Sequence, residues 1–161
     1  MTHPLRIPAQ QDQLTTNFRR TEFACKGETC CGNTAAINPI LVYSLQILRD
    51  LIGAPIHVSS GFRCTVHNQA VGGSEHSYHC LGLAADIWTP HSDPPVVARL
   101  AHRIDLFRFG GMAVYENFVH LDIGEGPRRW GPWPHEQIWR DVPLQIRAME
   151  ELNIDARHPR P

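Results

Sequence analysis

Residues 72–87, GGSEHSYHCLGLAADI, hold four potential metal ligands within eleven positions. These ligands are His76, His79, Cys80 and Asp86. The end of the stretch, LAADIWT over 83–89, is an apolar run followed by a proline, and we expect it to form a strand. In that strand Asp86 shares a face with Ala84 and Trp88, and an acid in a short apolar strand is costly to bury unless it is paired or metal-bound. The stretch therefore predicts a metal site beside a strand.

A second segment, GGMAVYENFVHLDIG over 110–124, has the pattern of two strands joined by a tight turn near Glu116 and Asn117. On the second strand His120 and Asp122 alternate with apolar residues, so both side chains project from one face, roughly 7 Å apart. The chain thus offers two strands that each present a potential ligand. A structural interpretation stays open, since a lone strand histidine is commonly a packing residue and an aspartate can pair with an arginine.

The other periodic segments predict an α+β fold, with helices packed on a small, mainly antiparallel sheet. The segment 38–52 is a helix with an apolar stripe, which Asn38 and Pro39 begin and Gly53 ends. The further elements that we expect are a strand over 55–59, a short helix over 64–71, a helix over 92–107 and a possible helix over 135–152.

The length of 161 residues indicates one domain over 1–161, with residues 1–20 as an extended arm and residues 153–161 as a polar tail. The net charge of −1 argues against a nucleic-acid partner. No apolar run is long enough to cross a membrane, and the N-terminus has no signal-peptide pattern. We therefore expect a monomer that is made in the cytoplasm and is not inserted into a membrane.

Five cysteines do not form the even framework of a small disulfide-stabilised domain. Three of them lie in the heptapeptide CKGETCC over 25–31. This cluster fits reduced thiols, a local disulfide or a metal knuckle, and a four-cysteine zinc site would need Cys64 or Cys80 to join it. The spacing alone leaves these alternatives open.

Three segments in this order resemble the D-Ala-D-Ala carboxypeptidase-type zinc peptidases: SSGFRCTVHNQAVGG, S-x-H-x-x-G-x-A-x-D over 77–86, and FVHLD. That family has the hedgehog/D,D-peptidase fold and includes phage endolysin peptidases. The resemblance implies a Zn²⁺ cofactor with ligands His79, Asp86 and His120. It also implies that Arg63 and Ser77 bind and orient the substrate. His76 and Cys80 then become neighbours of the site rather than ligands.

The general base departs from the family pattern. Relatives place a carboxylate three residues before the last histidine, where this chain has Asn117, and an amide cannot accept a proton from water. Two carboxylates remain as catalytic candidates. We favour Asp122, on the strand face of the last histidine, over Glu116 in the turn.

The resemblance implies a zinc metallopeptidase that hydrolyses peptide bonds in the stem peptides of bacterial peptidoglycan, as a D,D-carboxypeptidase or an endopeptidase. The alternative is a non-catalytic zinc-containing module that binds peptidoglycan or a protein, which the amide at Asn117 favours. The lack of a signal-peptide pattern fits a phage or prophage product, and with that origin we expect the protein to act at the cell wall.

Overall fold

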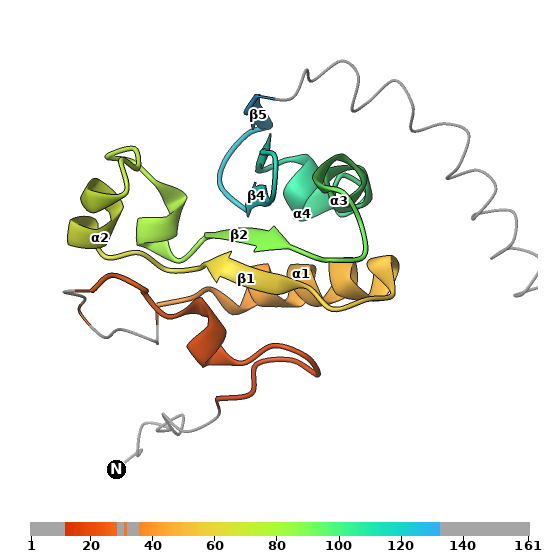
Figure 1. Cartoon of the computed structure of the whole chain (residues 1–161), viewed down its shortest axis with the longest axis horizontal. Coiled ribbons are helices and arrows are strands. Elements are labelled where there is room, and N and C mark those ends of the chain that lie inside the picture. The colour runs from red at the N-terminus through yellow and green to blue at the C-terminus, as the bar shows by residue number, and fades with distance from the viewer. Residues whose placement is uncertain (1–11, 29–30, 32–35, 133–161) are drawn as a thin grey trace, which may run out of the picture.

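The computed structural model describes residues 12–28, 31 and 36–132. These residues form an α+β fold around a five-stranded sheet with strand order β1-β2-β4-β3-β5, which confirms the predicted fold class (Figure 1). All neighbouring strands run antiparallel except β3 and β5, which are parallel. The strands are β1 (His57–Ser60), β2 (Ala84–Trp88), β3 (Gly111–Val114), β4 (Val119–Asp122) and β5 (Arg128–Trp130).

Helix α1 (Pro39–Ile52) begins and ends as its sequence predicts. The Asn38 side chain accepts a hydrogen bond from the Ile40 amide at 2.9 Å, and Gly53 ends the helix with a φ of 69°. The apolar stripe of the helix, formed by Leu41, Val42, Leu45 and Leu48, is buried.

One face of the sheet packs into the hydrophobic core. Val119 and Leu121 of β4 are buried there together with Ile87 of β2, as the strand alternation predicts. Helix α1 contacts helix α3 (Pro94–Ala101), and α3 contacts β3 and β4. The side chains that alternate with these along β2 and β4 therefore project from the other face of the sheet, away from the helices. Asp86 and His120 are among them.

The single helix expected over 92–107 is two helices, α3 and α4 (Asp105–Arg108). Ile104 between them has an extended backbone, with φ −95° and ψ 116°. Ile104 and Phe107 are both buried in the core. The break turns the chain so that both side chains reach the core, a tertiary effect that a helical periodicity does not reveal.

Residues 12–20 differ from the extended arm expected over 1–20. Gln13 and Arg19 form an isolated antiparallel bridge, and Phe18 is fully buried. The Phe18 ring lies 5.8 Å from that of Phe23 in the short helix η1 (Arg20–Phe23), so burial of two aromatic rings fixes this segment to the core. Residues 1–11, the possible helix over 135–152 and the polar tail lie outside the described residues.

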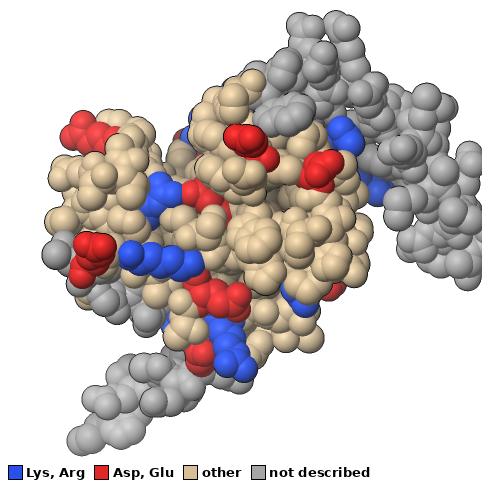
Figure 2. All heavy atoms as spheres, viewed as in Figure 1, with Lys and Arg blue, Asp and Glu red and all other residues tan. Residues whose placement is uncertain are grey.

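Two surface properties accord with the composition. On the face shown in Figure 2, acidic and basic side chains lie near one another rather than gathering into a field of one sign. Among the described residues, every helix is too short or too polar to cross a bilayer.

Candidate metal centre

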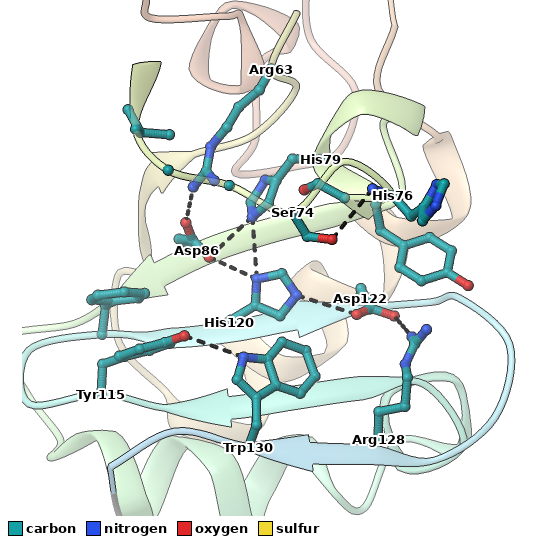
Figure 3. A pocket seen from close by; sticks show the side chains of 16 residues that line it. Arg63, Ser74, His76, His79, Asp86, Tyr115, His120, Asp122, Arg128 and Trp130 are labelled. Atoms are coloured by element: carbon teal, nitrogen blue, oxygen red, sulfur yellow. Dashed lines mark hydrogen bonds and ion pairs between the residues drawn. The ribbon is translucent and has the colours of Figure 1, made fainter. Parts of the chain in front are cut away.

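Three potential ligands meet where β2, β4 and the short helix η2 (Tyr78–Leu81) come together (Figure 3). Asp86 on β2 and His120 on β4 are direct register partners, and their Oδ1 and Nδ1 atoms lie 2.9 Å apart. His79 on η2 places Nε2 3.2 Å from both of these atoms. Residues that are 41 positions apart in the sequence thus present three donor atoms to one point.

The spacing of these donors fits a zinc ion. Four ligands arranged tetrahedrally about 2.0–2.1 Å from zinc lie roughly 3.3 Å from one another, close to the separations found here. Two imidazole nitrogens and one carboxylate oxygen are typical of a catalytic zinc site, which leaves its fourth position open. The three residues can therefore hold a metal ion, and their donor types and spacing fit zinc.

Hydrogen bonds fix the orientation of both histidines. His79 Nδ1 donates to the Gly61 carbonyl at 2.7 Å, which leaves the lone pair on Nε2 to face the other donors. His120 Nε2 donates to Asp122 Oδ2 at 3.2 Å, which leaves Nδ1 for the metal. The two rings therefore use opposite nitrogens, each held by an oxygen on its far side.

The Asp122 carboxylate is buried, and both of its oxygens accept hydrogen bonds. Its Oδ1 accepts hydrogen bonds from the amides of Gly111 (3.0 Å) and Gly124 (2.9 Å), and from Arg128 at 2.6 Å. Burial alone would raise the pKa of Asp122, but the hydrogen bonds from His120 and the two amides lower it below its ordinary value. Asp122 is therefore a carboxylate that positions His120 from behind.

Asp86 is held from the opposite side by Arg63. The Arg63 guanidinium binds Asp86 Oδ2 and donates through Nε to Ser60 Oγ at 2.7 Å. Burial would raise the pKa of Asp86, but hydrogen bonds from His120 and His79 hold it well below its usual range. Asp86 is thus ionised and presents Oδ1 to the metal site.

A glycine allows the end of η2 to lie close to the start of α1. Gly82, which ends η2, has a φ of 68°, and a Cβ there would lie 1.6 Å from the Ala36 carbonyl oxygen. The Gly82 carbonyl in turn accepts a hydrogen bond from the Asn38 amide at 2.9 Å. The close approach sets η2 against the start of α1 and so positions His79.

The metal centre opens into a cavity of about 500 Å³. The cavity contains the predicted ligands, and also Arg63, Ser77 and Asp122, which the sequence analysis singled out. Glu116 is exposed and lines an adjoining cavity, which shares Phe118 with the first. The structure thus brings together every predicted site residue except Glu116.

The further residues that line the cavity include Tyr78, Tyr115, Arg128 and Trp130. The Arg128 guanidinium stacks on the Tyr78 ring at 4.4 Å, and the Trp130 indole donates to the Tyr115 hydroxyl at 3.2 Å. The Trp130 ring also lies 5.0 Å from that of His120. Arg128 and Trp130 reach the site because β5 pairs with β3. The sequence RRW of β5 begins with two arginines and does not predict a strand.

We expect Asp122→Asn to weaken zinc binding at this centre by about 10- to 100-fold, the usual effect of losing such a partner. An amide that keeps its oxygen toward Gly111, Gly124 and Arg128 turns its NH₂ toward His120. The imidazole must then protonate on Nδ1, which removes the lone pair that the metal needs. Competition with a chromogenic chelator measures the affinity. Asp105→Asn, on the exposed side of α4, is the matched control, and equal affinities for the two variants would contradict the assigned role of Asp122.

Comparison with known proteins agrees with this geometry. The sequence profile of the peptidase M15 family matches residues 16–122. The zinc D-Ala-D-Ala carboxypeptidase of Streptomyces albus G is 29% identical over 131 residues, which cover 75% of this chain and 51% of that protein. The chain thus spans about half the length of this curated relative. Since the family profile covers most of the chain, including β1 to β4, η2 and the three residues that can hold a metal, the chain belongs to the peptidase M15 family.

Proposed function

We propose that the protein is a zinc-dependent peptidase that hydrolyses stem peptides of bacterial peptidoglycan at the cell wall. The supporting observation is one open cavity that combines a three-ligand metal centre with two arginines, Arg63 and Arg128. Stem peptides carry carboxylates, which guanidinium groups bind well. The Streptomyces relative is named a zinc D-Ala-D-Ala carboxypeptidase, and a substrate that ends in D-alanine is consistent with this proposal.

Arg63 is suited to bind the substrate carbonyl or terminal carboxylate. Its Nε and one terminal nitrogen are held by Ser60 and Asp86, so the guanidinium plane is fixed. The second terminal nitrogen makes no hydrogen bond that the described part of the chain shows, and it can donate to a ligand in the cavity. Ser77, before η2, lines the same cavity and offers a hydroxyl to the peptide backbone.

Zinc, when bound, polarises the scissile carbonyl and lowers the pKa of a water molecule toward 7. Arg63 stabilises the negative charge that develops on the substrate oxygen. Asp122 contacts His120 at Nε2, on the side of the ring away from Nδ1, and this contact supports a role in orienting His120 rather than in taking the proton from water. In this proposal Asp122 keeps the positioning role that its contacts support.

Proton transfer would then need Glu116, the other candidate carboxylate, to reach the metal cavity from the exposed turn beside it. In the described part of the chain no ion pair engages its carboxylate, and the turn that carries it lies next to Phe118 at the cavity wall. We expect Glu116→Gln to lower kcat by on the order of 10²- to 10⁴-fold, the usual contribution of a general base, with the zinc content unchanged.

The matched control for Glu116→Gln is Glu125→Gln, which removes another carboxylate from a turn near the sheet. Steady-state kinetics and metal analysis on the same preparations measure both quantities. Full activity of Glu116→Gln together with loss of activity in His76→Asn would move the proton-transfer role to His76, which lines the metal cavity.

The function itself is tested by digesting purified peptidoglycan and muropeptides with the zinc-loaded protein and identifying the products by mass spectrometry. Release of D-alanine from pentapeptides would indicate a D,D-carboxypeptidase, and shortened cross-linked dimers an endopeptidase. Sedimentation of the protein with intact cell walls, without any cleavage, would contradict the peptidase and favour the binding module that the amide at Asn117 suggests.

A further inference from the structure

A second group of potential metal ligands lies on the other side of the segment that carries Arg63. The Sγ atoms of Cys25, Cys31 and Cys64 lie within 4.8 Å of one another. The Nδ1 atom of His67 is 3.3 Å from Cys25 Sγ. None of these four residues belongs to the cavity of the catalytic metal centre. The CKGETCC cluster, whose role the sequence left open, is thus joined by two residues from a distant segment.

The fold builds this group from two chain segments. Cys64 is the N-cap of the short helix α2 (Thr65–Ala70), and His67 lies in the first turn, so a C-x-x-H spacing directs both side chains to one side. The loop after η1 brings the other two cysteines against α2. Its Gly27 packs so closely on His67 that a Cβ there would lie 3.0 Å from the Cβ and Cγ atoms of His67.

The surroundings of the sulfur atoms suit thiolates. Cys25 Sγ accepts a hydrogen bond from the Cys64 amide at 3.3 Å, and Cys64 Sγ accepts one from the His67 amide at 3.4 Å. Backbone donors of this kind stabilise the negative charge that a sulfur carries as a metal ligand.

A disulfide would use two sulfurs and leave the third beside an imidazole. A zinc ion would use all four groups. Thiolates bound tetrahedrally about 2.3 Å from zinc lie roughly 3.8 Å from one another. This separation is compatible with the three Sγ atoms, which all lie within 4.8 Å of one another. We propose that Cys25, Cys31, Cys64 and His67 bind a second zinc ion, in a closed four-ligand site that is structural and separate from the catalytic centre.

This second site would hold the segment on which the catalytic centre depends. Cys64 directly follows Arg63, and the Gly61 carbonyl orients His79. The Phe62 amide donates to the Phe23 carbonyl at 2.9 Å, so a backbone hydrogen bond already joins the same two segments. A metal bridge between them would fix the backbone from 61 to 64 against the N-terminal segment.

The test is a metal count on the full chain, purified anaerobically with a thiol reductant. We expect two zinc ions per chain in the wild type and one in His120→Ala. In the cobalt-substituted protein, the thiolate-to-cobalt charge-transfer band should persist in His120→Ala and disappear in Cys25→Ser/Cys64→Ser. Cys80→Ser, which changes a cysteine outside the group, should keep both metals and the band.

One zinc per chain in the wild type, or a cobalt spectrum of wild type and His120→Ala without the thiolate band, would overturn the second site. So would a disulfide between Cys25 and Cys64, found by peptide mapping of the anaerobic protein. An unchanged metal affinity in His67→Ala would remove His67 from the ligand set. The wild-type and His120→Ala measurements leave the cysteines intact and require no activity, so their outcome does not depend on the proposed function.

Discussion

His120→Ala is expected to remove zinc from the catalytic centre and to lower kcat/KM by on the order of 10³-fold or more. The site has three protein ligands, and the loss of one leaves two donors that cannot hold the ion in a defined geometry. Without the metal, the pKa of water stays far above the value near 7 that a bound zinc ion gives it. The expected result is thus a folded protein that lacks both the catalytic metal and its activity.

The appropriate control is His91→Ala, which removes an exposed histidine from the turn after β2. Metal analysis, muropeptide hydrolysis and circular dichroism on the same samples separate metal loss from unfolding. His120→Ala protein that keeps its full zinc content and cleaves muropeptides at the wild-type rate would contradict the assigned centre.

The second large effect is expected from Gly82→Ala, on stability rather than chemistry. Alanine at a φ of 68° costs about 1–2 kcal/mol, and overpacking costs typically 1–3 kcal/mol more. The new Cβ would meet the Ala36 carbonyl, which is backbone and cannot rotate away. We expect the free energy of unfolding to fall by about 3 kcal/mol or more, and the start of α1 to separate from η2.

Gly53→Ala separates the two causes. Gly53 has nearly the same φ, 69°, but a Cβ there meets no atom within 4 Å. It should therefore show the conformational cost alone, about 1–2 kcal/mol. Urea unfolding of the two variants measures the difference, and equal losses would mean that the contact with Ala36 carries no energy.

The sequence was sufficient for those parts of the fold that a local pattern determines. Asn38, Pro39 and Gly53 mark the ends of α1 by the chemistry of helix termini. The alternation of Val119, His120 and Leu121 predicts which side of β4 faces the core. The pairing of Asp86 with His120 is a long-range property, and the family resemblance rather than the pattern suggested it.

Other features depend on contacts that no local pattern encodes. Strand β5 is three residues long, begins with two arginines and is stabilised by parallel pairing with β3. Asp122 accepts hydrogen bonds from the amides of Gly111 in β3 and of Gly124 in the loop after β4, and only the folded chain brings these amides to it. Its position next to His120 suggested a base, and the local pattern does not reveal the four donors that surround its carboxylate in the fold.

The register of β2 against β4 links metal uptake to correct refolding. Asp86 and His120 face each other as direct partners in this pairing. A slip of one residue would place an apolar neighbour opposite one of them and turn the other toward the core. Chains that refold with misaligned central strands would then fail to take up the catalytic metal. The rate of metal capture after dilution from denaturant would therefore report how fast the central strands reach their native alignment.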